Sequence, residues 1–364
     1  MHTLHLSHSI NPSDGGIAVA VHSLIAAQTA AGQSSHWLTG DTFPPLLRDF
    51  QLRQSVLNEQ PSLLHLHGLW RSHTRIASAL SDSGLPLVVS LHGMLNPIAI
   101  AHSGWKKKLV WSLWERRALL SSCCLHALST SEAATIRALL PQASIAVIPN
   151  GVEIPAEEVG LMTSAPWDST IPSGSKVLLF LSRFHSGKGI KPLLSAWQAM
   201  LSEAEHRGWW LAIVGYGDNN ALKYQLNRFP IPRCQVFGPV FGPDKKAALR
   251  SASAFVLPSH FEALPMAALE AMAYRLPCLL SDACNLPEAF SLGAAISAEP
   301  NPDALTKSLS KIFALSQADR ETMGSAGYDL VASRYSWCDI AEKTLGLYNW
   351  ILEGGDIPGF VEMG

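Results

Sequence analysis

The sequence predicts an α/β protein made of two doubly wound parallel sheets, and three observations lead to this prediction. Short runs rich in leucine and β-branched residues alternate with longer helical stretches along the whole chain, which is typical of parallel strands joined by crossover helices. The 364 residues exceed one ordinary core and fit two domains of roughly 150 to 200 residues each. The alternation is also interrupted near the middle of the chain, between residues 151 and 175.

The first half contains short predicted strands with helices between them. These strands cover residues 4–7, 35–38, 63–66, 87–91, 125–128 and 145–148. The opening residues Met1 to Leu6 alternate in hydropathy as a strand does, and they lack the basic start and apolar core of a secretion signal. We therefore expect the chain to stay in the cytosol.

The interruption near the middle is the predicted linker between two Rossmann-like domains. It is punctuated by Pro155, Gly160, Pro166, Pro172 and Gly174, which break regular structure. The strand pattern then resumes at residues 177–181, 211–214, 235–237, 254–257 and 278–280. We expect domains at residues 1–165 and 172–335, followed by a closing helix and tail at 336–364, where apolar residues recur at helical spacing.

The composition excludes several classes of protein. Hydrophobic residues make up 48%, charged residues 15%, and the formal net charge is −2, so neither disorder nor nucleic-acid binding is expected. Apolar runs fall far short of the roughly 20 residues that cross a bilayer. The six cysteines form no Cys-x-x-Cys pair, which indicates reduced, mostly core thiols rather than a zinc site or disulfides.

A histidine pair, His65 and His67, lies at the end of a predicted strand, with His73 nearby. No carboxylate that could complete a metal site stands close to the pair in the sequence. We interpret the pair as structural or substrate-facing and expect no metal.

Paired glycines follow the first predicted strand. Gly15 and Gly16 stand just before a helix that begins near Ile17. Glycines let backbone amides approach a ligand closely, and a helix N-terminus favours an anion. The alternative is an ordinary tight turn between strand and helix.

Two cations follow the strand at residues 177–181. Arg183 comes directly after it, and Lys188 stands five residues later, before an amphipathic helix at 190–201. Doubly wound sheets bind ligands at the carboxyl ends of their strands. There Arg183 can donate two parallel hydrogen bonds to a phosphate, and Lys188 can approach it as a mobile point charge. The alternative is a solvated basic loop.

Two acidic residues follow the strand at 254–257. Glu262 lies in the loop, and Glu270 falls in the second turn of a helix that begins near Leu264 or Pro265. The rest of that helix is mostly Ala, Leu and Met, so the Glu270 carboxylate needs a polar partner. Two ribose hydroxyls would satisfy it.

These acidic residues resemble the Glu-x7-Glu motif of retaining GT-B glycosyltransferases, family 4, also called glycosyltransferase group 1. Other segments are similar to that family in the same order along the chain. They are Gly15-Gly16, 65–68, 91–94, 148–152, 182–183, 188–189, 213–217 and 236–240. The sequence departs from the family at Tyr274-Arg275, where a small residue and Gly are usual, and at Asp218, where Pro is frequent.

The resemblance implies a GT-B fold, in which two Rossmann-like domains face a central cleft and a C-terminal helix returns toward the N-terminal domain. It implies transfer of a sugar from a nucleoside-diphosphate sugar to a glycan or lipid-linked acceptor, with retention, in surface polysaccharide or lipopolysaccharide synthesis. Two interpretations compete with it: an epimerase or phosphorylase of the same shape, and a non-catalytic nucleotide-sugar binder. The sequence does not indicate which nucleotide or sugar is used.

The same resemblance implies a role for each matching residue. Arg183 and Lys188 would neutralise the donor pyrophosphate, Glu262 would contact the transferred sugar and Glu270 would hold the ribose. Backbone near the helix start and in two glycine-containing turns would complete the donor site. The residues concerned are Gly15, Gly16, Gly215, Val240, Ala263, Leu264, Pro265 and Met266.

His92 ends an apolar strand directly before Gly93. A lone histidine there is commonly a core residue, but its position and the resemblance favour contact with the transferred sugar or the departing phosphate. No Asp-x-Asp stands at a suitable strand end, and Arg183 with Lys188 can take over the neutralising role of a metal ion. We therefore expect metal-independent catalysis, and the resemblance implies front-face attack on the sugar.

Residues 105–117 combine three tryptophans with a basic cluster, Lys106 to Lys108. On a helix this segment can rest on an anionic membrane surface near a lipid-linked acceptor. The alternative is an ordinary amphipathic helix with a solvated basic edge.

Overall fold

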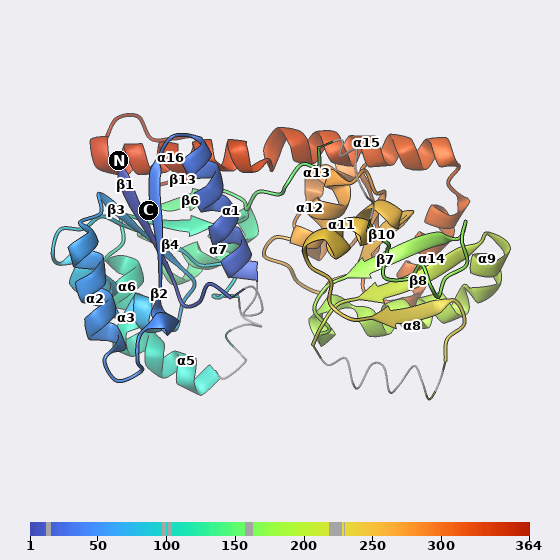
Figure 1. Ribbon diagram of the computed structural model, residues 1–364, viewed down its shortest axis with the longest axis horizontal. Coiled ribbons are helices and arrows are strands. Elements are labelled where there is room, and N and C mark those ends of the chain that lie inside the picture. Colours follow the sequence, from blue (N-terminus) through green and yellow to red (C-terminus); the bar gives the residue numbers. More distant parts are fainter. Residues whose placement is uncertain (12–15, 97–99, 101–103, 157–162, 218–227, 229) are drawn as a thin grey trace. The chain divides into compact units, whose positions relative to one another are not determined.

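The computed structural model describes residues 1–11, 16–96, 100, 104–156, 163–217, 228 and 230–364. It divides into two compact units (Figure 1). The first unit contains residues 1–151 and 337–364, and the second contains residues 152–336. The chain therefore leaves the first unit after Gly151 and returns to it at Trp337.

The first unit is built on a seven-stranded sheet in the order β13-β6-β5-β4-β3-β1-β2. Its strands are β1 (His2–Ser7), β2 (Ser34–Thr39), β3 (Leu63–His67), β4 (Leu87–Ser90), β5 (Cys124–Ala127), β6 (Ile145–Val147) and β13 (Val361–Glu362). The first six pair in parallel, whereas β13 pairs with β6 in antiparallel. The sequence predicted the six parallel strands and missed β13, because a strand of two residues is too short to show alternating hydropathy.

Helices cover both faces of this sheet. On one face lie α2 (Arg48–Glu59), α3 (Ser72–Ser81), α6 (Arg116–Leu120) and α7 (Thr130–Leu139). On the other face α1 (Gly16–Ala30) packs beside α16 (Trp337–Glu353) (Figure 1). Alternate strand residues divide between the two: Leu64 faces the first group of helices, and Leu63 faces α1 and α16. The predicted return of the C-terminal helix to the N-terminal domain is confirmed.

One helical stretch of the first unit changes its winding. α5 (Gly104–Val110) continues through a π-helical turn at Trp111–Glu115 into α6. Glu115 is fully buried there and accepts hydrogen bonds from the Trp70 N–H (2.5 Å) and the Thr74 hydroxyl (2.6 Å). Its carboxylate thereby ties the loop after β3 to the end of this helix.

The second unit is built on a six-stranded parallel sheet in the order β12-β11-β10-β7-β8-β9. Its strands are β7 (Lys176–Leu181), β8 (Trp209–Val214), β9 (Cys234–Phe237), β10 (Ala254–Leu257), β11 (Cys278–Leu280) and β12 (Ala295–Ser297). The sequence predicted all of these except the three-residue β12. Two doubly wound parallel sheets confirm the predicted α/β class.

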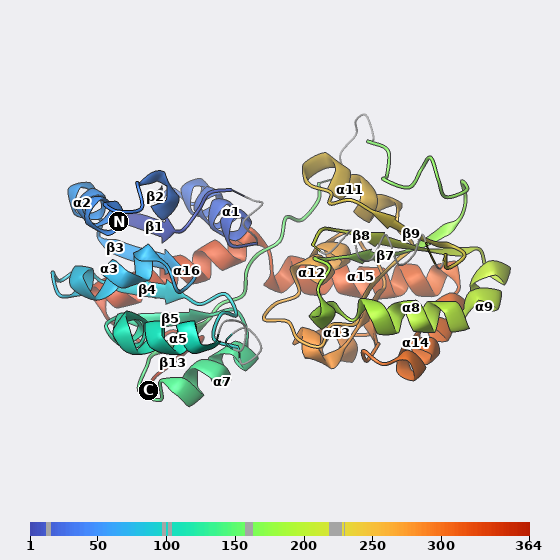
Figure 2. The same ribbon diagram turned by 90° about the horizontal axis from the view of Figure 1, so that it is seen from below.

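The helices of the second unit are α8 (Ile190–Ala199), α9 (Leu201–His206), α11 (Gly242–Ser251), α12 (Met266–Ala273), α13 (Pro287–Ser291), α14 (Pro302–Ala314) and α15 (Gln317–Arg334). α8 packs beside α14, and α12 packs beside α15 (Figure 2). Short 3-10 turns, η4 (Ser186–Lys188) and η5 (Asp282–Cys284), follow β7 and β11.

The boundary between the units differs from the prediction, which ended the first domain at residue 165. In the structure the segment after Gly151 already packs on the second unit. The Val152 N–H donates to the Tyr335 carbonyl (2.7 Å), and Lys246 pairs with Glu153 (2.7 Å). Trp167 is buried and lies edge-on to Phe237. Residues 163–175 are irregular, as predicted, but their buried side chains make them part of a core.

All six cysteines are free thiols. Cys124, Cys278 and Cys284 are buried, whereas Cys123 and Cys338 are exposed. Burial raises the pKa of the Cys284 thiol to about 12, which keeps it protonated. Across the described ranges, the helices are all too short or too polar to pass through a bilayer.

Candidate functional site

The predicted residues of the second unit gather at one edge of its sheet. Arg183 follows β7, Gly215 follows β8, Val240 follows β9 and Glu262 follows β10. These four strands are neighbours in the order β10-β7-β8-β9 and run in parallel. Their carboxyl ends therefore meet at a common edge, which is where doubly wound sheets bind ligands.

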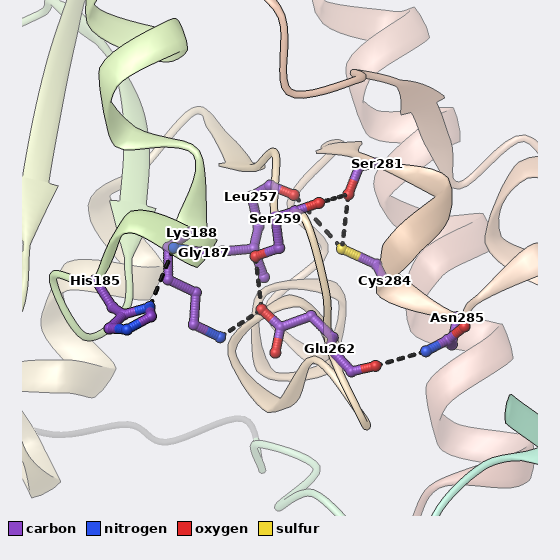
Figure 3. Close-up of polar contacts among 9 residues, drawn as sticks. All are labelled: His185, Gly187, Lys188, Leu257, Ser259, Glu262, Ser281, Cys284 and Asn285. Atoms are coloured by element: carbon purple, nitrogen blue, oxygen red, sulfur yellow. Dashed lines mark hydrogen bonds and ion pairs between the residues drawn. The ribbon is translucent and has the colours of Figure 1, made fainter. Parts of the chain in front are cut away.

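Lys188 and Glu262 form an ion pair at this edge, with Nζ 2.6 Å from Oε1 (Figure 3). The Ser259 hydroxyl donates to the same oxygen at 2.6 Å. The Glu262 side chain is 9% exposed and that of Lys188 is 20% exposed. A nearly buried carboxylate is thus held by a cation that still reaches solvent.

The backbone around Glu262 is fixed by several hydrogen bonds. The Glu262 N–H donates to the Ala283 carbonyl (3.0 Å), and the Asn285 amide donates to the Glu262 carbonyl (2.5 Å). The His260 N–H donates to the Gly187 carbonyl of η4 (2.8 Å). The loops after β7, β10 and β11 are therefore joined, and the position of Glu262 is set before any ligand binds.

Glycines at this edge are required by close backbone contacts. Gly189 has φ +68°, and a Cβ there would overlap the carbonyl oxygen of Pro258. Gly215 has φ +156°, and a Cβ there would overlap the carbonyl oxygen of Ser182. Gly215, which was predicted to bind the donor, is therefore also required by the local backbone packing.

Glu270 has a partner that the sequence did not reveal. Lys245 of α11 places Nζ 2.7 Å from Glu270 Oε1, and the Glu270 side chain is 24% exposed. Glu270 therefore has a polar partner, as the sequence requires, and this partner is a lysine of the same unit. The sequence could not reveal this pair, because Lys245 and Glu270 lie on different helices and 25 residues apart.

The start of α12 differs from the prediction in detail. The helix begins at Met266 with Pro265 as its N-cap. Pro265 has no N–H, and the Met266 N–H already donates to the Leu264 carbonyl (3.0 Å). The sequence predicted that backbone from Ala263 to Met266 binds the donor. In the part of the chain that the structure describes, only Ala263 and Leu264 of these four have a backbone N–H without an acceptor.

The other predicted donor residues lie as follows. Arg183 is exposed, and no ion pair joins it to another described residue. Val240 is half-buried beyond β9. Gly16 is the first residue of α1 and is exposed, while Gly15 and Asp218 lie outside the described residues. Arg275 takes the left-handed conformation (φ +59°) at the end of α12, the conformation that Gly usually supplies.

His92 lies at the carboxyl end of β4 in the first unit, in a left-handed conformation (φ +52°) that is uncommon for a non-glycine residue. Glu132 holds this turn: its Oε1 accepts from the Gly93 N–H (2.5 Å) and its Oε2 from the Leu128 N–H (2.8 Å). Burial raises the pKa of the Glu132 carboxyl. Sequence reasoning missed Glu132, although Ser129 three residues earlier forms the N-cap of α7.

His92 belongs to a group that we call the histidine layer. It contains the buried His5, His65, His67 and His126 and the half-buried His92. The nitrogens of His5, His65 and His67 lie within 4.8 Å of one another, a spacing that a metal ion can use. However, both ring nitrogens of each of these three are already hydrogen-bonded to protein groups. The structure therefore agrees with a structural interpretation of His65 and His67.

Two cavities lie near these elements. In the first unit a cavity of about 210 Å³ is lined by residues that include His67, Arg71 and His73. His73 Nε2 bonds the Gly68 carbonyl (2.9 Å), and its buried Nδ1 has no partner among the described residues. In the second unit a cavity of about 890 Å³ is lined by Glu153, Lys246 and Arg250 among others and by none of the predicted donor residues.

Two family models match the chain. Residues 162–330 match the family described as glycosyl transferases group 1, and residues 35–151 match the glycosyl transferase 4-like domain.

Curated relatives are similar over most of the chain. An uncharacterized glycosyltransferase of Methanocaldococcus jannaschii is 25% identical over 337 residues, covering 87% of this chain and 82% of its own. The GDP-mannose:cellobiosyl-diphosphopolyprenol alpha-mannosyltransferase of Xanthomonas oryzae is 24% identical, covering 82% and 77%.

Solved structures share the fold. Sucrose-phosphate synthase from Thermosynechococcus elongatus has a TM-score of 0.73 at 16% identity, covering 98% of this chain and 100% of its own. HepE from Anabaena, solved in complex with UDP-glucose, has a TM-score of 0.73 at 17% identity, covering 95% and 99%. WaaG, a glycosyltransferase involved in lipopolysaccharide biosynthesis, has a TM-score of 0.70 at 14% identity, covering 97% and 100%.

Proposed function

This chain is a GT-B glycosyltransferase, and we propose that it transfers a sugar from a nucleoside-diphosphate sugar to a glycan or lipid-linked acceptor with retention of configuration. The observation that carries the proposal is the ion pair between Lys188 and Glu262 at the carboxyl edge of the second sheet, the edge at which the exposed Arg183 also follows its strand. A role in surface polysaccharide or lipopolysaccharide synthesis is part of the proposal, supported by the similarity to WaaG and to the Xanthomonas mannosyltransferase.

Charge is the proposed means of catalysis. When the nucleoside diphosphate departs, negative charge builds on its phosphates, and donors aimed at that charge lower the barrier. Lys188 is a point charge on a flexible stem, so it can turn from Glu262 toward a phosphate while Arg183 binds a second oxygen. Glu262 is then left to accept hydrogen bonds from hydroxyls of the transferred sugar.

The remaining roles follow from the same edge of the sheet. Glu270, held by Lys245 at 2.7 Å, is proposed to accept from the two ribose hydroxyls. The N–H groups of Ala263 and Leu264 are proposed to donate to the diphosphate. Gly215 and Val240 are proposed to border the nucleoside.

Removing either cation tests this assignment. We expect Arg183→Ala and Lys188→Ala each to lower kcat by about 10²-fold or more, the scale observed when one charge-stabilising donor is lost. Lys191→Ala, which removes an exposed lysine of α8 close by in the sequence, is the matched control and should leave kcat unchanged. Transfer assays with UDP-, GDP- and ADP-sugars provide the measurement, and near wild-type turnover in both variants would refute the assignment.

Metal independence is proposed on the same ground, because Arg183 and Lys188 supply the positive charge that a divalent cation supplies in other transferases. Activity should persist undiminished in excess EDTA. Loss of activity that Mg²⁺ or Mn²⁺ restores would overturn this part of the proposal without affecting the assignment as a transferase.

Peripheral membrane contact through residues 105–117 is also proposed. Trp105, Leu109 and Leu113 stand on successive turns and are 70%, 54% and 62% exposed. Exposed Lys106 and Lys108 flank this apolar stripe, and a hollow of about 710 Å³ lies beside it, lined mainly by apolar residues. Apolar residues next to cations suit an anionic lipid surface, where a lipid-linked acceptor would be found.

A further inference from the structure

The histidine layer is joined into one continuous path of hydrogen bonds that ends at His92. It crosses β5, β4, β3 and β1 on the face of the sheet that α1 and α16 cover. Register places neighbours side by side: His5 opposite His65, His67 opposite Ser90, and Ser90 opposite His126. Gln28 of α1 and Tyr348 of α16 complete the path.

The direction of hydrogen-bond donation along the path is set by a backbone carbonyl at the end farthest from His92. His126 Nε2 lies 2.6 Å from the Ile148 carbonyl oxygen, which can only accept, so Nε2 carries the proton. A neutral imidazole has one N–H, and His126 Nδ1 must therefore accept from the Ser90 hydroxyl (2.5 Å). The Ser90 oxygen in turn accepts from His65 Nε2–H (2.6 Å).

The same logic continues into the two covering helices. His65 Nδ1 is now an acceptor and takes the Tyr348 hydroxyl proton (2.5 Å). The Tyr348 oxygen accepts from the Gln28 amide nitrogen (3.4 Å). This orients the amide, so that Gln28 Oε1 accepts from the Ser35 hydroxyl (2.8 Å) and from His5 Nε2–H (2.9 Å).

The last two steps reach His92. His5 Nδ1 has no proton and accepts from His67 Nε2–H (2.9 Å). His67 Nδ1 then accepts from His92 Nε2–H (3.2 Å). Within the described chain, His92 Nδ1 is the one ring nitrogen of the layer that lacks a protein partner. Because the single proton of the neutral His92 ring is on Nε2, Nδ1 carries a lone pair.

These hydrogen-bond directions require neutral rings, and burial keeps the rings neutral. Burial lowers the pKa of His5 and His126 to about 4 and that of His92 to about 3. Burial and the neighbouring rings hold the pKa of His65 and His67 well below 6.5. The reverse arrangement would leave two lone pairs facing each other at the Ile148 carbonyl.

We propose that this path holds His92 in the Nε2–H tautomer, so that Nδ1 binds its ligand as a hydrogen-bond acceptor. On the basis of the proposed function, that ligand group is a hydroxyl of the transferred sugar and not an oxygen of the departing phosphate, because a phosphate oxygen has no proton to donate. His67, Gln28 and Tyr348 act as positioning residues, since they act on the ligand only through His92.

Nitrogen-15 NMR of the full chain labelled in its histidine rings tests the inference directly, because a protonated and an unprotonated ring nitrogen have well separated shifts. Loss of one ring system in His92→Asn assigns the His92 signals. We expect wild-type His92 to show protonated Nε2 and unprotonated Nδ1 near neutral pH. A predominant Nδ1–H form, or an even mixture of the two forms, would overturn the inference.

A second experiment breaks the path at a residue far from His92. Tyr348→Phe removes one hydroxyl from α16, and the His92 shifts should move toward the average of the two tautomers because Gln28 is no longer held. Unchanged His92 shifts in a folded Tyr348→Phe protein would refute the positioning role. If that variant does not fold, Ser90→Ala, which breaks the path between His126 and His65, is measured instead with the same criteria. Ring shifts of His5, His65 and His67 that respond together to added Zn²⁺ would also contradict the inference, since a metal would replace these hydrogen bonds.

These measurements need no sugar donor. They therefore decide the tautomer even if no transfer activity is found, and a failure of the proposed function remains distinguishable from a failure of the inference.

Discussion

At the scale of single residues, the site depends on two acid–base pairs, Lys188 with Glu262 and Lys245 with Glu270. The Lys245–Glu270 pair is partly exposed and contributes little to stability by itself, whereas the Glu262 carboxylate of the other pair is nearly buried. Their common feature is that a lysine holds a carboxylate in one orientation. The proposed donor would take Lys188 away from Glu262, whereas Lys245 would stay with Glu270 and keep it aimed at the ribose.

The Lys245 contact leads to a prediction about donor binding. We expect Lys245→Met to raise the KM for the donor by about tenfold with a smaller effect on kcat, because a hydrogen bond to a charged group contributes about 1.5 to 3 kcal/mol and the ribose stays distant from the reacting bond. Steady-state kinetics with varied donor provide the measurement.

Lys246→Met is the matched control for that prediction, because the neighbouring Lys246 pairs with Glu153 instead. Equal effects of the two substitutions, or no effect of Lys245→Met, would show that the contact with Glu270 does not matter for donor binding.

The sequence predicted both members of the first pair, Lys188 and Glu262, but only Glu270 of the second. Glu262 and Glu270 stand in a recognisable spacing, and Lys188 follows a strand. Lys245 and Glu132 have no local pattern, because their roles arise from which helices and loops become neighbours in the fold. The polar partner that the sequence requires for Glu270 is therefore supplied by the protein itself.

At the scale of elements, the histidine layer shows how a parallel sheet can bury polar side chains. Alternation puts polar residues from several neighbouring strands on the same face, two of them from β3. Every ring has a hydrogen-bond partner, so the burial penalty is offset. The sequence shows His65-x-His67, but the other members stand singly, and Tyr348 is 283 residues away from His65. Register and the return of α16 were needed to bring them together.

Burial of neutral histidines predicts an acid-labile first unit. The pKa of His5 and of His126 is about 4 in the folded chain, against an ordinary value of 6.5 that the unfolded chain keeps, so between these values the unfolded chain binds more protons. Stability therefore falls as pH drops below about 6.5, by about 1.4 kcal/mol per pH unit for each such histidine at most. Urea denaturation followed by tryptophan fluorescence from about pH 7.5 to 5 measures this slope.

His126→Asn, which removes one of these histidines, should reduce the slope. A stability that stays level over this pH range would contradict the prediction, and so would a stability that rises toward acid.

At the scale of the whole molecule, the sequence predicted two doubly wound domains and the helix that returns, but it put the boundary 14 residues too late, at 165 instead of 151. Proline and glycine marked irregular backbone correctly, yet irregular backbone can still be buried, as Trp167 shows. Composition reports where helices and strands stop, and only side-chain packing reports to which core a segment belongs.

The apolar stripe on α5 leads to a prediction about membrane association. Replacing Lys106, Lys107 and Lys108 by Ser should weaken binding to phosphatidylglycerol vesicles by about 10²-fold at low salt, since each lysine near an anionic surface contributes about 1 kcal/mol. Vesicle cosedimentation provides the measurement.

Ser substitutions at Lys191, Lys307 and Lys311 change the net charge equally on the second unit and are the matched control. If both triple variants bind alike, the segment at 105–117 is an ordinary solvated helix.

The split composition of the first unit has a consequence for synthesis on the ribosome. Its first 151 residues are translated early, but α16 and β13 belong to residues 337–364. Tyr348 can therefore cover His65 only after the whole second unit has been synthesised. During that interval the polar face is open to water and to chaperones. A stop codon before residue 337 would thus leave a complete second unit attached to a first unit that has lost one of its covering helices.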